Sequence, residues 1–144
     1  MNGKFKTLRN VTAFIAIAAL TLLATGRSLA LEINDTGIVV YYFHRTIRCP
    51  SCLLLEEITR ETIAFRFDRE LENGDIKFEI VNVDEEENEH YVEHYDLSVQ
   101  TIVVSKIENG QEKQWKKLDK VWSFLHDEGR TFEYIQEEII SYLN

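Results

Sequence analysis

The sequence predicts an α/β domain in which a central mixed β-sheet is flanked by helices, in the order β-α-β-α-β-β-α. Three observations lead to this class. Residues 37–43 read GIVVYYF, an apolar run that is typical of a strand buried on both faces. A long segment with helical spacing follows and leads to a second strand-like run at 76–83. Later, Asn109-Gly110 separates two further strand-like runs, as in a two-residue hairpin turn.

The first helix is expected from about 50 to 71, after a loop at 44–48. At 100° per residue, its apolar side chains fall on two faces. One face carries Leu54, Leu55, Ile58, Thr62 and Phe65. The other carries Leu53, Ala64, Phe67 and Leu71. Two apolar faces predict a helix that packs between the sheet and a second layer, or a helix that bends part-way.

A charged run at 84–89 follows the second strand and is expected to open a short helix. Acidic side chains suit this position because they oppose the positive end of the helix dipole. The short helix presents Tyr91, Val92 and Tyr95.

Strands at 101–107 and 111–116 form the predicted hairpin, the second at the sheet edge. A short helical turn then carries Leu118, Val121, Trp122 and Leu125. The last helix is expected to start near Thr131 and to present Phe132, Ile135, Ile139 and Leu143. The first β-α-β unit needs a right-handed crossover, and the hairpin adds the antiparallel strands.

Residues 1–30 have the pattern of a secretory signal peptide. A basic start precedes an almost unbroken apolar run at 11–25, and Ser28 and Ala30 offer small residues before a cleavage position. The apolar run is shorter than the roughly 20 residues that span a bilayer, although an uncleaved anchor is the alternative. We therefore expect residues 31–144 to form one exported domain, in the periplasm or another extracytoplasmic compartment.

The composition indicates a folded and acidic protein. Hydrophobic residues make up 44% of the chain, more than a disordered chain would carry. A net charge of -9 argues against a nucleic-acid partner, because phosphate binding needs basic patches. The same charge favours solubility and disfavours adhesion to anionic lipid, so contact with the membrane is expected only through the N-terminal segment.

Cys49 and Cys52 are the two cysteines of the chain, and their Cys-Pro-Ser-Cys motif lies between the first strand and the first helix. Free backbone N–H groups and the dipole at a helix start stabilise an anion. We therefore expect the pKa of the Cys49 thiol to fall below the free value of about 8.5, with Arg48 acting in the same direction. Pro50 suits the first helical position, where its missing N–H costs nothing.

Cys52 lies one turn further along the helix and is expected to be more buried. This asymmetry predicts that Cys49 attacks a partner disulfide and that Cys52 resolves the mixed disulfide. Glu56, one turn beyond Cys52, should favour the protonated form of the Cys52 thiol. A purely structural disulfide is the alternative, but a bridge between residues three apart constrains the unfolded chain little.

The order of strand, Cys-x-x-Cys, helix, strand, helix, hairpin and helix over residues 37–144 resembles the thioredoxin superfamily. Within it, the segments YYFH…RCPSC, VNVDEEENEHYVEHYDL and WKKLDKVW resemble a narrower group of exported bacterial proteins. That group is associated with accessory subunits for nitroaryl reduction, including nitroaryl-arsenical reduction, beside membrane electron-transfer permeases. The resemblance implies a thioredoxin-like fold and a redox-active dithiol, and we expect no cofactor.

The sequence departs from the thioredoxin pattern around the dithiol. Thioredoxins place a cis-proline opposite the dithiol, and Thr101 stands at that position here. A cis bond before Thr101 would cost roughly 2.5–4 kcal/mol, so we expect a trans bond. The buried acid and lysine of thioredoxins map to Phe43 and Ile80. The aromatic residue that usually precedes the motif is absent, and Ile47 and Arg48 stand there instead. These changes argue against fast general disulfide reduction, but not against disulfide exchange.

A metal site is a further alternative. Zinc needs about four ligands, usually Cys or His, and His44 is the one histidine close to the dithiol in sequence, so no metal is assigned there. His90 and His94 lie one helical turn apart and could hold a divalent ion, but a solvated polar face explains them as well. The run at 84–89 lacks the spacing of a calcium loop.

The sequence therefore predicts an extracytoplasmic thiol–disulfide oxidoreductase. It would pass electrons between a membrane thiol carrier and a disulfide-bearing partner protein or reductase. Arg48, Pro50 and Thr101 would support the dithiol. The alternatives are a non-catalytic accessory subunit that binds a partner, and a dithiol protein that handles metal.

Overall fold

A computed structural model describes residues 36–144 of the protein. The predicted signal peptide at 1–30 and its cleavage position lie outside the described residues. Within 36–144, no helix is both long and apolar enough to cross a membrane.

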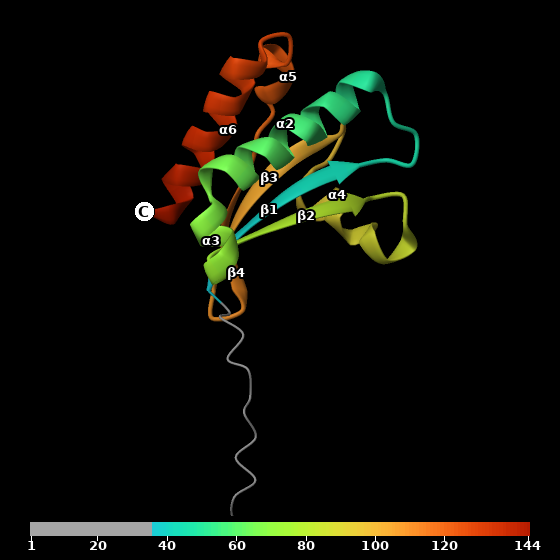
Figure 1. The fold of residues 1–144 in the computed structure, drawn as a ribbon. Coiled ribbons are helices and arrows are strands. Elements are labelled where there is room, and N and C mark those ends of the chain that lie inside the picture. Colours follow the sequence, from blue (N-terminus) through green and yellow to red (C-terminus); the bar gives the residue numbers. More distant parts are fainter. Residues whose placement is uncertain (1–35) are drawn as a thin grey trace, which may run out of the picture. The chain divides into compact units, whose positions relative to one another are not determined.

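The described residues form a four-stranded mixed sheet in the order β2-β1-β3-β4 (Figure 1). Strand β1 (Gly37–His44) pairs in parallel with β2 (Ile76–Asn82) and antiparallel with β3 (Thr101–Glu108). Strand β4 (Gln111–Lys117) pairs antiparallel with β3 and forms an edge. The predicted mixed sheet, the central place of the first strand and the edge position of the hairpin's second strand are confirmed.

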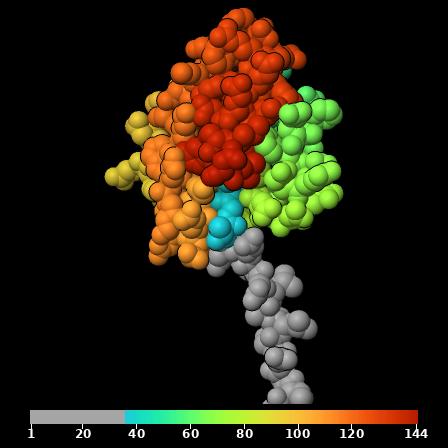
Figure 2. All heavy atoms as spheres, turned by 90° about the vertical axis from the view of Figure 1, so that its left-hand side faces the viewer, coloured from blue at the N-terminus to red at the C-terminus, as the bar shows by residue number. Residues whose placement is uncertain are grey.

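Helices cover both faces of the sheet. They are α2 (Pro50–Arg66), α3 (Asp68–Asn73), the 3-10 turn η1 (Glu86–Asn88), α4 (His90–His94), α5 (Val121–Phe124) and α6 (Glu128–Leu143). Helices α2 and α6 lie on one face of the sheet, and α4 lies on the other (Figure 1). In Figure 2, α6 (red) lies between the β3–β4 hairpin (orange) and the green segment that contains α3.

Alternate side chains of β1 enter two separate apolar clusters, because successive residues of a strand point to opposite faces. Val40 and Tyr42 are fully buried under α2 and α6. Tyr41 and Phe43 pack on the other face against Tyr95 of the segment after α4. The uniformly apolar sequence of β1 follows from this burial on both sides.

The helix predicted at 50–71 is not continuous: it is interrupted at Phe67, near its expected end. The backbone leaves the helical conformation at Phe67, with φ −131° and ψ 32°, and a separate helix α3 follows. The bend places the Phe67 ring in the core, where it is 3% exposed. The chain thus takes the bent form that the two apolar faces allowed.

Only one face of α2 is covered, so the first alternative, a helix packed between the sheet and a second layer, is wrong. Phe65 is 78% exposed and Leu53 is 52% exposed. Thr62 is fully buried on the predicted face, Thr59 is also fully buried, and their hydroxyls donate to the carbonyl oxygens of Ile58 and Leu55 respectively. These bonds satisfy the hydroxyls within the helix, which is why two polar residues can face the core.

Helix α6 begins at Glu128 rather than near Thr131. Asp127 caps it, since its carboxylate accepts a hydrogen bond of 3.1 Å from the backbone N–H of Arg130. Near its end, Tyr142 is 6% exposed and Leu143 is 38% exposed, so Tyr142 takes the core position predicted for Leu143. The prediction placed the start too late because it followed the apolar residues, which begin at Phe132, whereas the capping residue Asp127 lies before them.

The predicted hairpin turn at Asn109-Gly110 is confirmed. Both residues have positive φ, 55° and 71°. Asparagine and glycine tolerate this region best, and two such residues match the twist of the strands that they join.

Candidate functional site

Cys49 and Cys52 form a disulfide at the start of α2. Cys49 is the N-cap of the helix, with φ −85° and ψ 159°, and Pro50 occupies the first helical turn. The Cys49 Sγ accepts a hydrogen bond of 3.1 Å from the backbone N–H of Cys52. The Cys49 carbonyl oxygen accepts from the N–H groups of Cys52 and Leu53 at 3.0 Å and 3.1 Å. The predicted placement of Cys49 at a helix start is therefore confirmed.

The two sulfurs differ in accessibility. Cys49 is exposed at the surface, whereas Cys52 is 2% exposed. The predicted difference in burial is confirmed. Because disulfide exchange requires a thiolate to approach one sulfur, the Cys49 sulfur is the one that a protein partner can reach.

The loop that carries the motif is anchored to the end of β2. The Arg45 guanidinium pairs with the Asp84 carboxylate at 2.8 Å, and the backbone N–H of Thr46 donates to the other oxygen at 2.9 Å. The Thr46 N–H, and then the Arg45 guanidinium, hold the pKa of the Asp84 carboxyl below its usual range. Asp84 thus restrains the loop between β1 and α2, a role that its place in a charged run did not suggest.

The sequence led us to expect a free positive charge at Arg48 beside the dithiol, but the structure pairs this charge. Arg48 pairs with Glu56, and its guanidinium lies 5.7 Å from the centroid of the Tyr42 ring. Glu56 also accepts from Arg60 at 2.9 Å. Burial would raise the pKa of the Glu56 carboxyl, but the pairs with Arg48 and Arg60 outweigh it and lower that pKa.

Tyr42 ties the first turn of α2 to the central strand. Its buried hydroxyl donates a hydrogen bond of 2.6 Å to the Cys52 carbonyl oxygen. Burial raises the pKa of the Tyr42 hydroxyl, so it remains a donor at neutral pH. Tyr42 and Arg60 were not singled out from the sequence. The spacing of Glu56 and Arg60, one helical turn apart, was the available signal for part of this network.

No family model and no curated protein matches the chain. Among solved structures, it is similar to a mutant thioredoxin from Halobacterium salinarum NRC-1, at 24% identity over 77% of this chain and 79% of that chain, with a TM-score of 0.43. It is also similar to thioredoxin from Trypanosoma brucei brucei, at 17% identity over 80% and 86%, with a TM-score of 0.43. Mitochondrial thioredoxin 3 from Saccharomyces cerevisiae matches at 17% identity over 58% and 69%, with a TM-score of 0.38.

The strand order β2-β1-β3-β4, with the dithiol between β1 and α2 and a helix on each face, matches the predicted arrangement. The fold is thioredoxin-like.

Thr101 lies at the same end of the sheet as the dithiol loop. It begins β3 and pairs with Phe43, close to the end of β1. No peptide bond in the described residues is cis, so the trans bond expected before Thr101 is confirmed. Thr101 is fully buried, and its hydroxyl has no hydrogen-bond partner among the described residues.

The thioredoxin-like sheet has an aromatic cluster where the resemblance implies a buried acid. Phe43 is 1% exposed, and its ring lies 5.2 Å from Tyr91 and 5.5 Å from Tyr95. Ile80, at the position of the implied lysine, is 36% exposed. An acid–lysine pair of the thioredoxin kind is therefore absent from these two positions.

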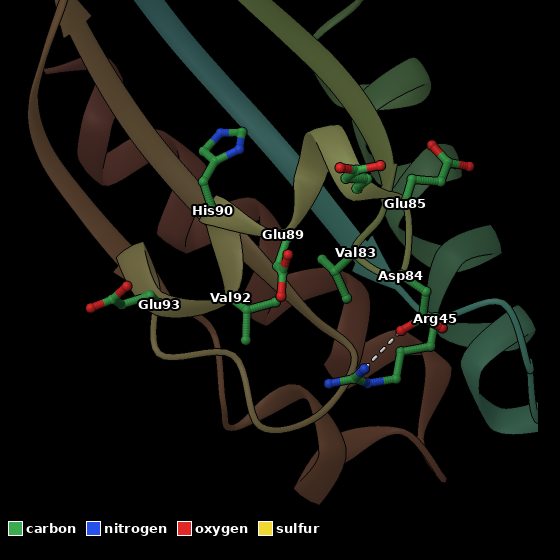
Figure 3. Close-up of a pocket in the computed structure, with 9 residues that line it drawn as sticks. Arg45, Val83, Asp84, Glu85, Glu89, His90, Val92 and Glu93 are labelled. Carbon is green, nitrogen blue, oxygen red and sulfur yellow. Dashed lines mark hydrogen bonds and ion pairs between the residues drawn. The ribbon is translucent and has the colours of Figure 1, made fainter.

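An acidic cavity of about 950 Å³ lies beside Arg45, where the loop that carries the dithiol leaves β1 (Figure 3). It is lined by Arg45, Val83, Asp84, Glu85, Glu86, Glu89, His90, Val92 and Glu93. Neither cysteine lines it. Arg45, whose pair with Asp84 is drawn in Figure 3, supplies the one basic side chain of the lining apart from the His90 imidazole. An anionic small molecule would be repelled there.

The two histidines of α4 bind separate groups. The His90 Nδ1 lies 2.8 Å from the Glu87 carbonyl oxygen, and the His94 Nε2 lies 2.6 Å from Glu112. Within residues 36–144, no three or more His, Cys, Asp or Glu side chains are grouped to hold a metal ion.

Proposed function

We propose that this protein is an extracytoplasmic thiol–disulfide oxidoreductase that exchanges electrons with protein partners through Cys49 and Cys52. One observation carries the proposal: the disulfide lies at the N-terminus of α2, with one sulfur exposed and the other buried. A structural bridge has no need of this asymmetry, whereas disulfide exchange uses it, because the partner attacks one sulfur and displaces the other.

In the reducing direction, the Cys49 thiolate attacks a partner disulfide, forms a mixed disulfide and releases one partner thiolate. The Cys52 thiol then loses its proton and attacks the Cys49 sulfur. The second partner sulfur leaves as a thiolate, and the Cys49–Cys52 disulfide forms. Two electrons have moved from the protein to its partner. The opposite direction runs the same steps in reverse, beginning with attack of a partner thiolate on the Cys49 sulfur.

The expected partners are a membrane thiol carrier on one side and a disulfide-bearing protein or reductase on the other. The predicted signal peptide supports a location outside the cytoplasm. The narrower sequence resemblance supports an accessory role beside a membrane electron-transfer system, with nitroaryl reduction as the associated chemistry. The acidic cavity next to the dithiol loop would favour a partner with basic side chains near its reactive sulfur.

Trapping tests this proposal directly. A Cys52→Ser variant expressed in the native host should accumulate as a mixed disulfide with its partner, because the resolving thiol is missing. The partner is released by dithiothreitol and identified by mass spectrometry. Cys49→Ser is the matched control and should trap nothing, since Cys52 is buried. Equal and low levels of mixed disulfides in the two variants would refute the proposed oxidoreductase function.

A non-catalytic accessory subunit is the second candidate. Phe43 and Ile80 favour it, since they replace the acid and lysine that the resemblance implies for proton transfer. In that case, the double variant Cys49→Ser/Cys52→Ser would still co-purify with its partner and would complement the host. If the protein is an oxidoreductase, the double variant should not complement the host.

A further inference from the structure

We propose that Glu56 is a positioning residue that neutralises Arg48 beside the dithiol and thereby keeps the reduction potential of the Cys49–Cys52 pair low. The inference deepens the proposed function and rests on it for its biological meaning. The property itself belongs to the dithiol and can be measured without a partner.

The first step is the position of the ion pair. Arg48 directly precedes Cys49, and Glu56 lies one helical turn after Cys52. Their ion pair therefore joins the chain on both sides of the Cys-Pro-Ser-Cys motif. The Arg48 and Glu56 side chains are 22% and 15% exposed, so solvent and salt screen the pair less than a surface pair.

The second step is how Arg48 is held. Its guanidinium lies over the Tyr42 ring, while Tyr42 donates to the Cys52 carbonyl oxygen at 2.6 Å. The Arg48 Nε is buried without a hydrogen-bond partner among the described residues. The guanidinium is thus held by Tyr42 and Glu56 close to the motif, with part of its hydrogen-bonding capacity unused.

The third step is electrostatic. A thiolate at Cys49 is stabilised by the helix N-terminus and by a positive charge nearby. Glu56 cancels the charge of Arg48, and its other carboxylate oxygen is occupied by Arg60. Removing the Glu56 charge leaves Arg48 uncompensated and stabilises the thiolate. Because a stabilised reduced form makes a dithiol a stronger oxidant, Glu56 holds the potential down.

The test compares Glu56→Gln with Glu61→Gln, which removes the same charge from an exposed position of α2. Each purified protein is equilibrated with reduced and oxidised glutathione, and the fraction reduced is measured by thiol alkylation. The thiolate of each reduced protein is titrated by its ultraviolet absorbance. Glu56→Gln should shift the glutathione equilibrium at least threefold toward the reduced protein and lower the pKa of the Cys49 thiol. Glu61→Gln should change the equilibrium by less than half as much.

A second variant separates action through Arg48 from direct action on Cys52. Arg48→Met should shift the equilibrium toward the disulfide, because it leaves the Glu56 charge without Arg48 beside the dithiol. The double variant Arg48→Met/Glu56→Gln, which lacks both charges, should return close to the native equilibrium. Equal shifts in Glu56→Gln and Glu61→Gln would overturn the inference. An Arg48→Met equilibrium equal to that of the native protein would overturn the part played by Arg48. Circular dichroism checks that each variant is folded, and Arg48→Gln, which also removes the charge, replaces Arg48→Met if that variant is not.

The two proposals can fail independently. If Cys52→Ser traps no partner but Glu56→Gln shifts the glutathione equilibrium, the proposed function fails and the electrostatic role of Glu56 stands. If trapping succeeds and the equilibrium does not move, the role of Glu56 fails alone.

Discussion

The Tyr42 hydroxyl donates a hydrogen bond of 2.6 Å to the backbone carbonyl oxygen of Cys52. This bond links the central strand to the first turn of α2, where the disulfide lies. It also fixes the ring over which the Arg48 guanidinium is placed. The site is therefore supported from the core of the sheet, and not only by the loop that precedes it.

Tyr42→Phe removes this bond and keeps the buried ring. We expect the free energy of unfolding to fall by roughly 1 kcal/mol, since the hydroxyl is lost without leaving a new unpaired donor. Urea unfolding followed by far-ultraviolet circular dichroism measures the change. An unchanged midpoint would show that the bond adds no net stability.

Reduction of the disulfide should leave the protein folded. The cysteines are separated by three positions, so the bridge closes a very short loop. The entropy removed from the unfolded chain corresponds to ~2 kcal/mol at most. Thermal unfolding of the oxidised protein, the reduced protein and Cys49→Ser/Cys52→Ser measures the effect. The reduced protein and the double variant should behave alike, and loss of the folded state in either would contradict the prediction.

Glu112 should make the protein sensitive to acid. Its carboxylate accepts hydrogen bonds from His94, from the Tyr95 hydroxyl and from the Ser105 hydroxyl. Burial would raise the pKa of Glu112, but these bonds outweigh it and lower the pKa below the ordinary value of 4.5. The unfolded chain then binds the proton more tightly than the folded protein. The stabilisation is complete above the ordinary value and is lost as pH falls through the lowered pKa.

Glu112→Gln tests this pH dependence. At pH 7 we expect a loss of roughly 1–3 kcal/mol in the free energy of unfolding, because hydrogen bonds to a charged acceptor are lost. Between pH 5 and pH 3, the variant should lose less stability than the native sequence. Urea unfolding at each pH measures both effects, and exposed Glu61→Gln is the control. Parallel pH profiles for Glu112→Gln and the native protein would contradict the prediction.

Gly37 should not tolerate a side chain. A Cβ at this position would lie 2.7 Å from the Asp75 carbonyl oxygen, which also accepts the backbone N–H of Ile38 at 2.8 Å. Gly37→Ala is therefore expected to cost roughly 1–3 kcal/mol, because the backbone between β1 and the turn before β2 must shift. Gly129→Ala is the matched control. Its Cβ would lie 3.6 Å from the Asp127 carboxylate within α6, and we expect no loss of stability. Equal effects of the two substitutions would refute the steric argument.

The strands, the hairpin and the start of α2 could be predicted because local chemistry decides them. An apolar, β-branched run favours a buried strand, and Asn109-Gly110 accepts positive φ at two successive positions. Pro50 after Cys49 favours a helix start at that point. Each of these preferences acts over a few residues, so the sequence alone placed the dithiol at the N-terminus of a helix.

Other features depend on residues that lie far apart in the chain. The bend at Phe67 and the exposure of Phe65 follow from which face of α2 the sheet and α6 cover. Arg48 lies in the loop before α2 and Glu56 lies on α2, eight residues further along the chain, and the fold brings the two side chains into contact. The sequence determined where the reactive sulfurs lie, through backbone preferences over a single turn. The tertiary structure decided how Arg48 is neutralised and held, because charge pairing and burial depend on distance in space.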